Sequence, residues 1–301
     1  MLKIAHSSIY AHPLPEGHRF PMLKYELIPE QLLHEGSITA KHLFVPESCS
    51  ATDVLLTHDL AYYERLIHLQ LSPSEQRVIG FPQSEELIRR EQIITQGTID
   101  CSLYALQHGC AMNVAGGTHH AFADRGEGFC LLNDMAVAAN YLLHHNLVKR
   151  ILIVDLDVHQ GNGTAKLMEN VHEVFTCSVH GKNNYPFRKE KSDLDIGLED
   201  GISGEAYLHT LDFFLPKLVE TFQPDFVFYL AGVDVLATDK LGRFNLSISE
   251  CKQRDKFVLE LMHKNRIPVS IALGGGYSPD IKDIVEAHCN TFRLALDLFD
   301  S

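Results

Sequence analysis

Three polar side chains alternate along an otherwise apolar segment, "ILIVDLDVHQGNG" at residues 151–163; they are Asp155, Asp157 and His159. The apolar run that opens the segment is typical of a strand buried on both faces. Since alternate side chains of a strand share a face, the three polar groups point the same way. Burying a carboxylate is costly unless it is paired, hydrogen-bonded or bound to a metal. The segment therefore predicts a buried polar site where a strand ends.

The spacing of these residues favours a metal site. Same-face neighbours on a strand lie about 6.6 Å apart at Cα, so Asp157 and His159 can reach one ion, whereas Asp155 would lie about 13 Å from His159. We therefore expect Asp155 to orient an imidazole rather than to bind the metal. Asp234 follows another apolar run, "DFVFYLAG", and is the expected third ligand. Three protein ligands with one open position are typical of catalytic zinc sites.

Two further segments carry groups suited to catalysis beside such a metal. His119 and His120 follow two glycines, and one could take a proton from water while the other orients it. Tyr277 follows "LGGG" and could donate a hydrogen bond to a developing oxyanion. Taken alone, the histidines could equally sit on an exposed loop and Tyr277 could be a packing residue. The second pair, His144 and His145, lies within a predicted helix and is given no catalytic role.

The elements that must position these groups alternate between strand and helix. We expect strands at "LKIA", 111–117, 151–154, 173–179, 225–232 and 268–273, and helices at 84–110, 133–146, 164–170, 205–222, 249–265 and the C-terminus. Ser278 is the expected N-cap of the last helix, with Pro279 in its first turn. This alternation predicts one α/β domain over residues 1–301 with a mostly parallel sheet. Ligands of such sheets bind at the carboxyl ends of the strands, where the four chemical segments 116–122, 155–163, 231–239 and 273–278 fall.

Composition and charge limit the remaining possibilities. The 301 residues are 45% hydrophobic and 22% charged, and no apolar stretch approaches the roughly 20 residues of a membrane helix. The N-terminal residues lack the features of a signal peptide, and the seven cysteines are scattered, so we expect a soluble cytoplasmic protein. The net charge of −13 argues against nucleic acid as a partner and mildly favours cationic partners.

The ordered motifs "GGTHHAF…GEGFCLLND", "DLDVHQGNG", "AGVDVLATDKLGRFNLS" and "LGGGY" resemble the metal-dependent histone deacetylase superfamily over essentially the whole chain. The likeness is greatest to the class IV branch and its bacterial relatives. It implies the arginase/deacetylase fold, with a central eight-stranded parallel sheet. It also implies one zinc ion and assigns roles to eight side chains: zinc ligands Asp157, His159 and Asp234; tandem histidines His119 and His120, with His120 as general base; their partners Asp155 and Asn162; and the oxyanion donor Tyr277.

The resemblance extends to the substrate tunnel and to a second ion. It implies that the tunnel and its floor are formed by Gly128, Phe129, Tyr185 and Gly275. It implies a structural potassium ion held around Asp155, Asp157 and His159 and by Ser178. It also places Arg19 in an internal channel for the acetate product.

Two departures from related proteins bear on the chemistry. Some family members pair the second histidine with aspartate, whereas this chain has Asn162, which orients an imidazole but stabilises its charged form less well. The related arginases bind a second metal through further aspartates. Here the corresponding positions are Gly161, Gly232 and Leu236, which argues against a binuclear ureohydrolase.

We therefore expect a zinc-dependent amidohydrolase that removes acetyl or longer acyl groups from lysine side chains of proteins or peptides. The class IV resemblance brings long-chain acyl groups into consideration. One alternative is a deacylase of small amines such as acetylpolyamines. Another is a protein that binds acyl-lysine without catalysis, although the retained ligands, histidines and Tyr277 argue against it.

Overall fold

The sheet that positions the site contains eight strands, all parallel, in the computed structural model, which describes residues 1–300. Across the sheet the order is β2 (Leu43–Phe44), β1 (Lys3–Ala5), β3 (Cys110–Asn113), β8 (Val269–Ala272), β7 (Phe226–Leu230), β4 (Ile151–Asp155), β5 (Val174–Gly181) and β6 (Leu194–Leu198). The expected α/β class, with one domain built on an eight-stranded parallel sheet, is confirmed.

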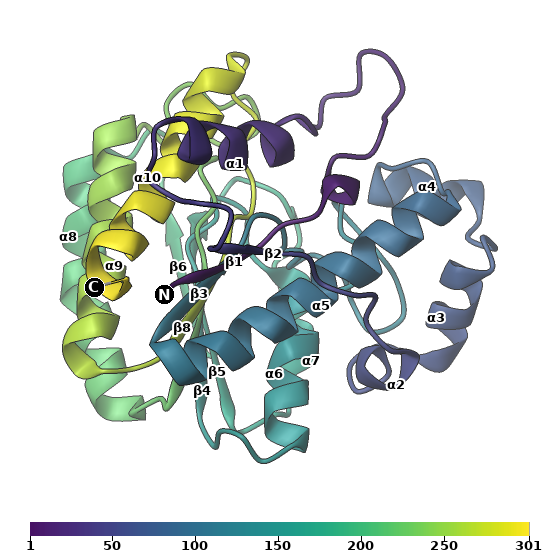
Figure 1. Ribbon diagram of the computed structural model, residues 1–301, viewed down its shortest axis with the longest axis horizontal. Coiled ribbons are helices and arrows are strands. Elements are labelled where there is room, and N and C mark those ends of the chain that lie inside the picture. The colour runs from purple at the N-terminus through teal and green to yellow at the C-terminus, as the bar shows by residue number, and fades with distance from the viewer. Residues whose placement is uncertain (301) are drawn as a thin grey trace.

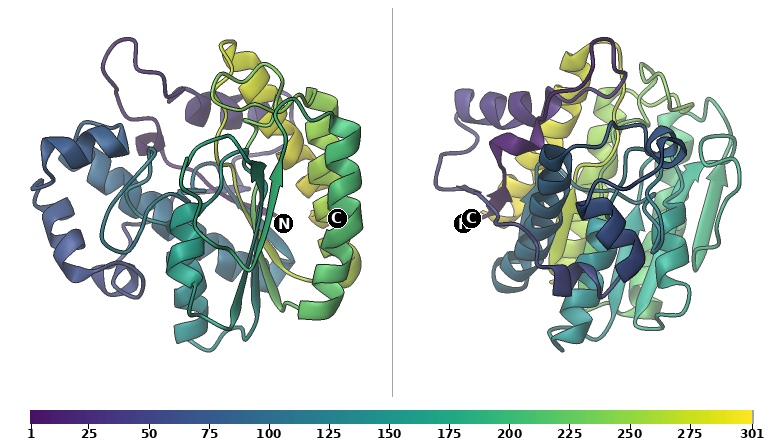
Figure 2. Two further views of the ribbon diagram at one scale, coloured as in Figure 1. Left: turned by 180° about the vertical axis from the view of Figure 1, so that it is seen from behind. Right: turned by 90° about the vertical axis from the view of Figure 1, so that its right-hand side faces the viewer.

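Helices cover both faces of the sheet (Figures 1 and 2). One layer contains α1 (Lys24–His34), α8 (Gly204–Phe222), α9 (Ile248–Asn265) and α10 (Ile281–Phe299). The other contains α5 (Glu85–His108), α6 (Asp134–His144) and α7 (Asn162–Met168). The short helices α2 (Ala51–Val54), α3 (Leu60–Ile67) and α4 (Pro73–Ile79) form a lobe beside one end of α5, and the turn η1 (Ser8–Tyr10) precedes α1.

Burial on both faces explains the apolar run that opens the segment 151–163. Ile151 and Ile153 pack in a buried cluster with residues of α5 and α6, whereas Leu152 and Val154 pack in a second cluster with residues of α8 and α9. Both faces of β4 are therefore buried. This explains why the strand carries no polar residue until its last position, Asp155.

Several boundaries differ from the sequence predictions. The last helix begins at Ile281 with Asp280 as its N-cap, so the assignment of Ser278 as the cap is wrong. The Ser278 hydroxyl lies 2.9 Å from Thr238 Oγ1 instead. Helix α7 begins at Asn162, two residues before the expected start, and strands β2 and β6 were not predicted.

Two general features bear on the setting of the protein. All seven cysteines are free and buried. Within residues 1–300, no helix is both long enough and apolar enough to span a membrane.

Candidate metal centre and active site

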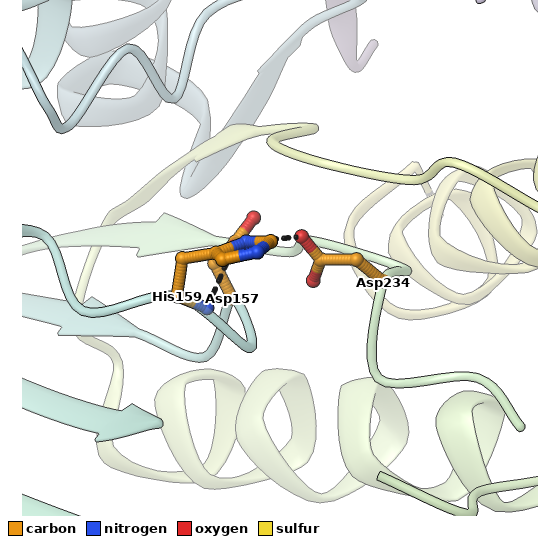
Figure 3. Close-up of side chains that lie close together, drawn as sticks. All are labelled: Asp157, His159 and Asp234. Atoms are coloured by element: carbon orange, nitrogen blue, oxygen red, sulfur yellow. Dashed lines mark hydrogen bonds and ion pairs between the residues drawn. The ribbon is translucent and has the colours of Figure 1, made fainter. Parts of the chain in front are cut away.

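The expected metal ligands meet where two neighbouring strands end. Asp157 and His159 follow β4, and Asp234 follows β7, which pairs with β4 in parallel. All three side chains are buried, and one ligand atom from each lies within 4.8 Å of the others (Figure 3). The parallel register therefore brings together residues that are 75 positions apart in the sequence.

Backbone N–H groups orient these ligands. Val158 N–H donates to Asp234 Oδ1 at 2.9 Å, and Gly275 N–H donates to Asp157 Oδ2 at 2.8 Å. His159 Nδ1 lies 3.0 Å from both Asp157 Oδ1 and Asp234 Oδ2. A Cβ atom on Gly275 would collide with the Asp234 carboxylate, so glycine keeps this space open.

The electrostatics of the cluster fit a bound cation. Burial raises the pKa of Asp234 to about 7, and the neighbouring Asp157 carboxylate adds to the rise. Burial lowers the pKa of His159, but its hydrogen bonds to Asp157 and Asp234 outweigh burial and raise it to about 10. Without a cation, protons on Asp234 and His159 therefore offset the negative charge of the two carboxylates. Two carboxylates and an imidazole nitrogen, open to a cavity on one side, match the donor set of a catalytic divalent-metal site.

The tandem histidines occupy contrasting environments. Asp155 Oδ2 lies 2.7 Å from His119 Nδ1, and Asn162 Oδ1 lies 2.7 Å from His120 Nδ1. Burial opposes a proton on His119, but the Asp155 carboxylate raises its pKa overall. Burial and then the positive charge of His119 lower the pKa of His120 well below its usual value. Such opposed shifts in adjacent groups are typical of an acid and a base.

Tyr277 lies beside the metal ligand His159, on the loop that follows β8. Its ring stands edge-on to His159, with centroids 6.3 Å apart, and it lines the inner cavity. Its backbone N–H donates to Asp239 Oδ2 at 2.5 Å, which fixes the loop. Burial, reinforced by Asp157 and Asp234, raises the pKa of Tyr277, so the phenol keeps its proton and remains a donor.

Two neighbouring cavities, which share His120, Gly128, Phe129, His159 and Tyr277 in their linings, lie beside these groups. The inner cavity has a volume of about 40 Å³, and its lining includes His119, His120, Asp157, His159, Gly128, Phe129, Gly275, Tyr277 and Arg90. The outer cavity has a volume of about 420 Å³, and its lining includes Gly128, Phe129, Tyr185, Tyr277, Arg19 and Lys240. The four residues expected to form the tunnel and its floor all line one or both cavities.

The placement of Arg19 differs from the expectation. Arg19 lies at the outer cavity, with its guanidinium 5.1 Å from the centroid of the Phe129 ring. The arginine that lines the inner cavity is Arg90 of α5, which is buried and donates from Nε to the carbonyl of Tyr10 at 2.7 Å. The loop before α1 carries Arg19 along the entrance, so it does not reach the inner cavity.

The potassium site stays a prediction. Ser178 lies opposite Asp155 in the β4–β5 register. The Ser178 hydroxyl lies 3.0 Å from His180 Nδ1.

Sequence reasoning missed several residues that hold the site together. Glu127 accepts a hydrogen bond from Asn162 Nδ2 at 3.0 Å, and Asp134 Oδ1 accepts from Thr118 N–H at 2.8 Å. Both acids lie inside the quoted segment "GEGFCLLND", so their charge in a largely apolar motif was the available signal. The fully buried Lys24 donates to the carbonyl of Gly274 at 2.8 Å from α1, a helix that was not predicted.

Comparisons with known proteins agree with this fold. The family profile described as "Histone deacetylase domain" matches residues 18–292. An uncharacterised protein of Picosynechococcus is 41% identical over 290 residues, covering 96% of this chain and 97% of its own. Histone deacetylase 2 of Arabidopsis thaliana is 28% identical, over 86% of this chain and 70% of its own. The crystal structure of a histone deacetylase homologue complexed with SAHA superposes with a TM-score of 0.82 at 25% identity, covering 98% of this chain and 83% of that one.

Proposed function

The chain belongs to the histone deacetylase family, and from this premise we propose that it hydrolyses the amide bond of acetyl-lysine in proteins or peptides. The observation that carries the proposal is the arrangement around the inner cavity. The Asp157, His159 and Asp234 cluster, two histidines with opposed pKa shifts and the Tyr277 phenol all meet there. Amide hydrolysis needs a base, an acid and a donor for the oxyanion, and each has a candidate.

The proposed mechanism assigns a separate task to each side chain. Asp157, His159 and Asp234 would hold a zinc ion, which would supply Lewis acidity toward the amide carbonyl and lower the pKa of water. His120, neutral beside Asn162, takes a proton from the attacking water. His119, cationic beside Asp155, donates a proton to the leaving amine, and the Tyr277 hydroxyl donates to the developing oxyanion.

The size of the inner cavity favours an acetyl group. One water molecule needs roughly 10–15 Å³ of cavity volume, so a cavity of about 40 Å³ holds about three waters. A methyl group fits this space, whereas the chain of a myristoyl group does not. We therefore favour acetyl over the long-chain acyl groups that the class IV resemblance brought into consideration; membership of that branch itself stays a prediction.

The charge of the entrance favours lysine in a peptide over a polyamine. Arg19, Lys240 and Arg243 line the outer cavity, and its lining within residues 1–300 contains no carboxylate. Arg243 is paired with Asp200 at 3.1 Å, while Arg19 packs over an aromatic ring. A polyamine carries further positive charges close to its acetylated end, and these would meet the cations of the entrance. The local charge thus opposes the preference for cationic partners drawn from the overall net charge.

The test compares substrates on one zinc-loaded preparation. We expect acetate release from acetyl-lysine peptides, with lower kcat/KM for myristoyl-lysine peptides and for acetylpolyamines, and loss of turnover on chelation. Binding of acetyl-lysine peptide without turnover would instead support the non-catalytic alternative. Higher kcat/KM for the acetylpolyamine would support the small-amine alternative.

A variant that lacks one of the three metal ligands tests the metal site itself. Asp234→Ala should lose both turnover and bound zinc, because a site with three protein ligands is left with two. Metal analysis of the purified variant checks the second effect independently of activity. Stoichiometric zinc with normal turnover in Asp234→Ala would contradict the assignment of the site.

A further inference from the structure

A hydrogen-bonded chain continues from the second histidine beyond Asn162. Asn162 Oδ1 faces His120 Nδ1 at 2.7 Å, and Asn162 Nδ2 donates to Glu127 Oε1 at 3.0 Å. The same Glu127 oxygen accepts a hydrogen bond from the Tyr185 hydroxyl. The Glu127 side chain is only 16% exposed. A carboxylate therefore stands one residue behind the amide that contacts His120.

A tight turn aims Glu127 at this chain. The N–H groups of Glu127 and Cys130 each donate to the other residue's carbonyl at 2.9 Å, which closes a two-residue hairpin turn. The central residues Gly128 and Phe129 have φ values of 54° and 69°. Positive φ at both central positions matches the twist of a tight hairpin. A Cβ on Gly128 would lie 2.8 Å from His120 Cδ2, so glycine also lets the turn approach the histidine.

We propose that Glu127 is a positioning residue that supplies, through Asn162, the negative charge that an amide alone cannot give His120. The inference rests on the proposed function. His119 has its carboxylate in direct contact at Asp155, whereas the carboxylate of the second pair lies one hydrogen bond further away. Because Asn162 donates to Glu127, its amide oxygen is held toward His120.

This orientation has a chemical consequence. An amide oxygen facing Nδ1 requires the proton of neutral His120 to sit on Nδ1, which leaves Nε2 free as the base toward the inner cavity. The Glu127 charge polarises the intervening amide and stabilises His120 when it becomes cationic. Arg125 Nε lies 3.9 Å from the other Glu127 oxygen, but its side chain is 45% exposed, so solvent screens it.

The main test removes one charge while keeping the shape. Glu127→Gln should lower kcat for acetyl-lysine peptide by about 10–100-fold, the usual scale for partners that orient a catalytic centre. KM and bound zinc should change little. Asp124→Asn is the matched control, since it removes the same charge from an exposed residue of the same loop and should retain wild-type kcat. Wild-type kcat in Glu127→Gln, or an equal loss in Asp124→Asn, would overturn the proposal.

A double variant distinguishes a charge effect of Glu127, acting through Asn162, from a packing role. The double variant Asn162→Asp with Glu127→Gln moves the carboxylate into direct contact with His120. Because a carboxylate in direct contact also raises the pKa of His120, we expect kcat to recover most of the loss on the alkaline side of the pH profile, where His120 is neutral. A double variant as slow there as Glu127→Gln alone would assign Glu127 a packing role only.

A spectroscopic readout keeps the inference testable apart from the proposed reaction. The ¹⁵N resonances of the His120 imidazole should show the Nδ1–H tautomer in the wild-type protein and a mixture of tautomers in Glu127→Ala, which removes the oxygen that accepts from Asn162 Nδ2. Failure of wild-type protein to release acetate would reject the proposed function. These spectra would still test whether Glu127 acts on His120 through Asn162. The same tautomer in both proteins would overturn that role.

Discussion

At the scale of single residues, the Tyr277 hydroxyl is the group whose removal separates chemistry from folding. Tyr277→Phe deletes one oxygen from a buried, protonated phenol and leaves its ring packed against Phe20 and Phe129. If the hydroxyl stabilises the oxyanion, kcat should fall by about 10²–10³-fold. KM should change much less, because the contact strengthens mainly in the transition state.

Steady-state kinetics with acetyl-lysine peptide, combined with zinc analysis and a thermal melt, check this expectation. Wild-type kcat with a lowered melting temperature would make Tyr277 a packing residue, which is the alternative stated in the sequence analysis.

The residues best predicted from the sequence are those whose spacing follows a regular element. Asp155, Asp157 and His159 alternate because strand geometry has a period of two, and the hydrogen bond between Asp155 and His119 agrees with the expected orienting role. Arg19 and Glu127 lie in irregular loops, where no period relates spacing to direction. Only the folded loop shows that Arg19 faces the entrance and that Glu127 reaches Asn162.

At the scale of elements, His58 ties the loop that carries the tandem histidines to the start of α6. His58 Nδ1 donates to the carbonyl of Phe122 at 2.9 Å, and His58 Nε2 accepts from the N–H of Asn133, the N-cap of α6, at 3.0 Å. The acceptor role of Nε2 needs a neutral ring, because a cationic imidazole carries a proton on both nitrogens. Burial accordingly lowers the pKa of His58 to about 4.

The lowered pKa of His58 predicts acid sensitivity with a defined sign. The unfolded chain takes up the His58 proton near pH 6.5, whereas the folded chain takes it up only near pH 4. The contribution of His58 to the free energy of unfolding is therefore present above pH 6.5 and is lost as the pH falls toward 4. Between pH 7 and pH 5 this histidine should account for about 2 kcal/mol of lost stability. His58→Gln should therefore show a loss smaller by that amount.

Urea unfolding at both pH values measures the effect, with His144→Gln at an exposed position of α6 as the control. An identical pH dependence in wild type and His58→Gln would contradict the role of burial.

The elements between residues 24 and 79 were missed for identifiable reasons. Helix α1 contains Pro29, which in a sequence usually indicates the end of a helix. Helices α2, α3 and α4 have only 4, 8 and 7 residues, too short to show a clear helical period. Helix α4 was nonetheless detectable, because Ser72 and Glu75 form a capping box around Pro73.

At the scale of the whole molecule, the fold class followed from the alternation of buried strands with helices, and the site followed from the rule that parallel strands end at one edge. That rule brought Asp234 to Asp157 and His159 without any information on contacts. Net charge was a poorer guide, because it averages over the surface. A chain with a charge of −13 presents Arg19, Lys240 and Arg243 around its outer cavity.

The metal cluster also predicts how the stability of the whole protein responds to zinc. The buried carboxylates of Asp157 and Asp234 both lie 3.0 Å from His159 Nδ1, an arrangement assembled by the fold and absent from the unfolded chain. A ligand that binds only the folded state at 100 times its Kd stabilises it by about 2.7 kcal/mol. For a chain of this size that corresponds to a rise of about 5 °C in Tm.

We therefore expect chelator-treated protein to regain about 5 °C in Tm when free zinc is restored to that level, as measured by thermal unfolding. Asp234→Asn is the matched variant, since it keeps the side-chain volume and the Oδ1 acceptor for Val158 N–H but removes one anionic ligand. Its response at the same zinc concentration should be much smaller, because weaker binding lowers the ratio of zinc to Kd. An equal rise in both proteins would place the stabilising zinc elsewhere, and no rise in the wild-type protein would mean that the three buried groups do not form a zinc site.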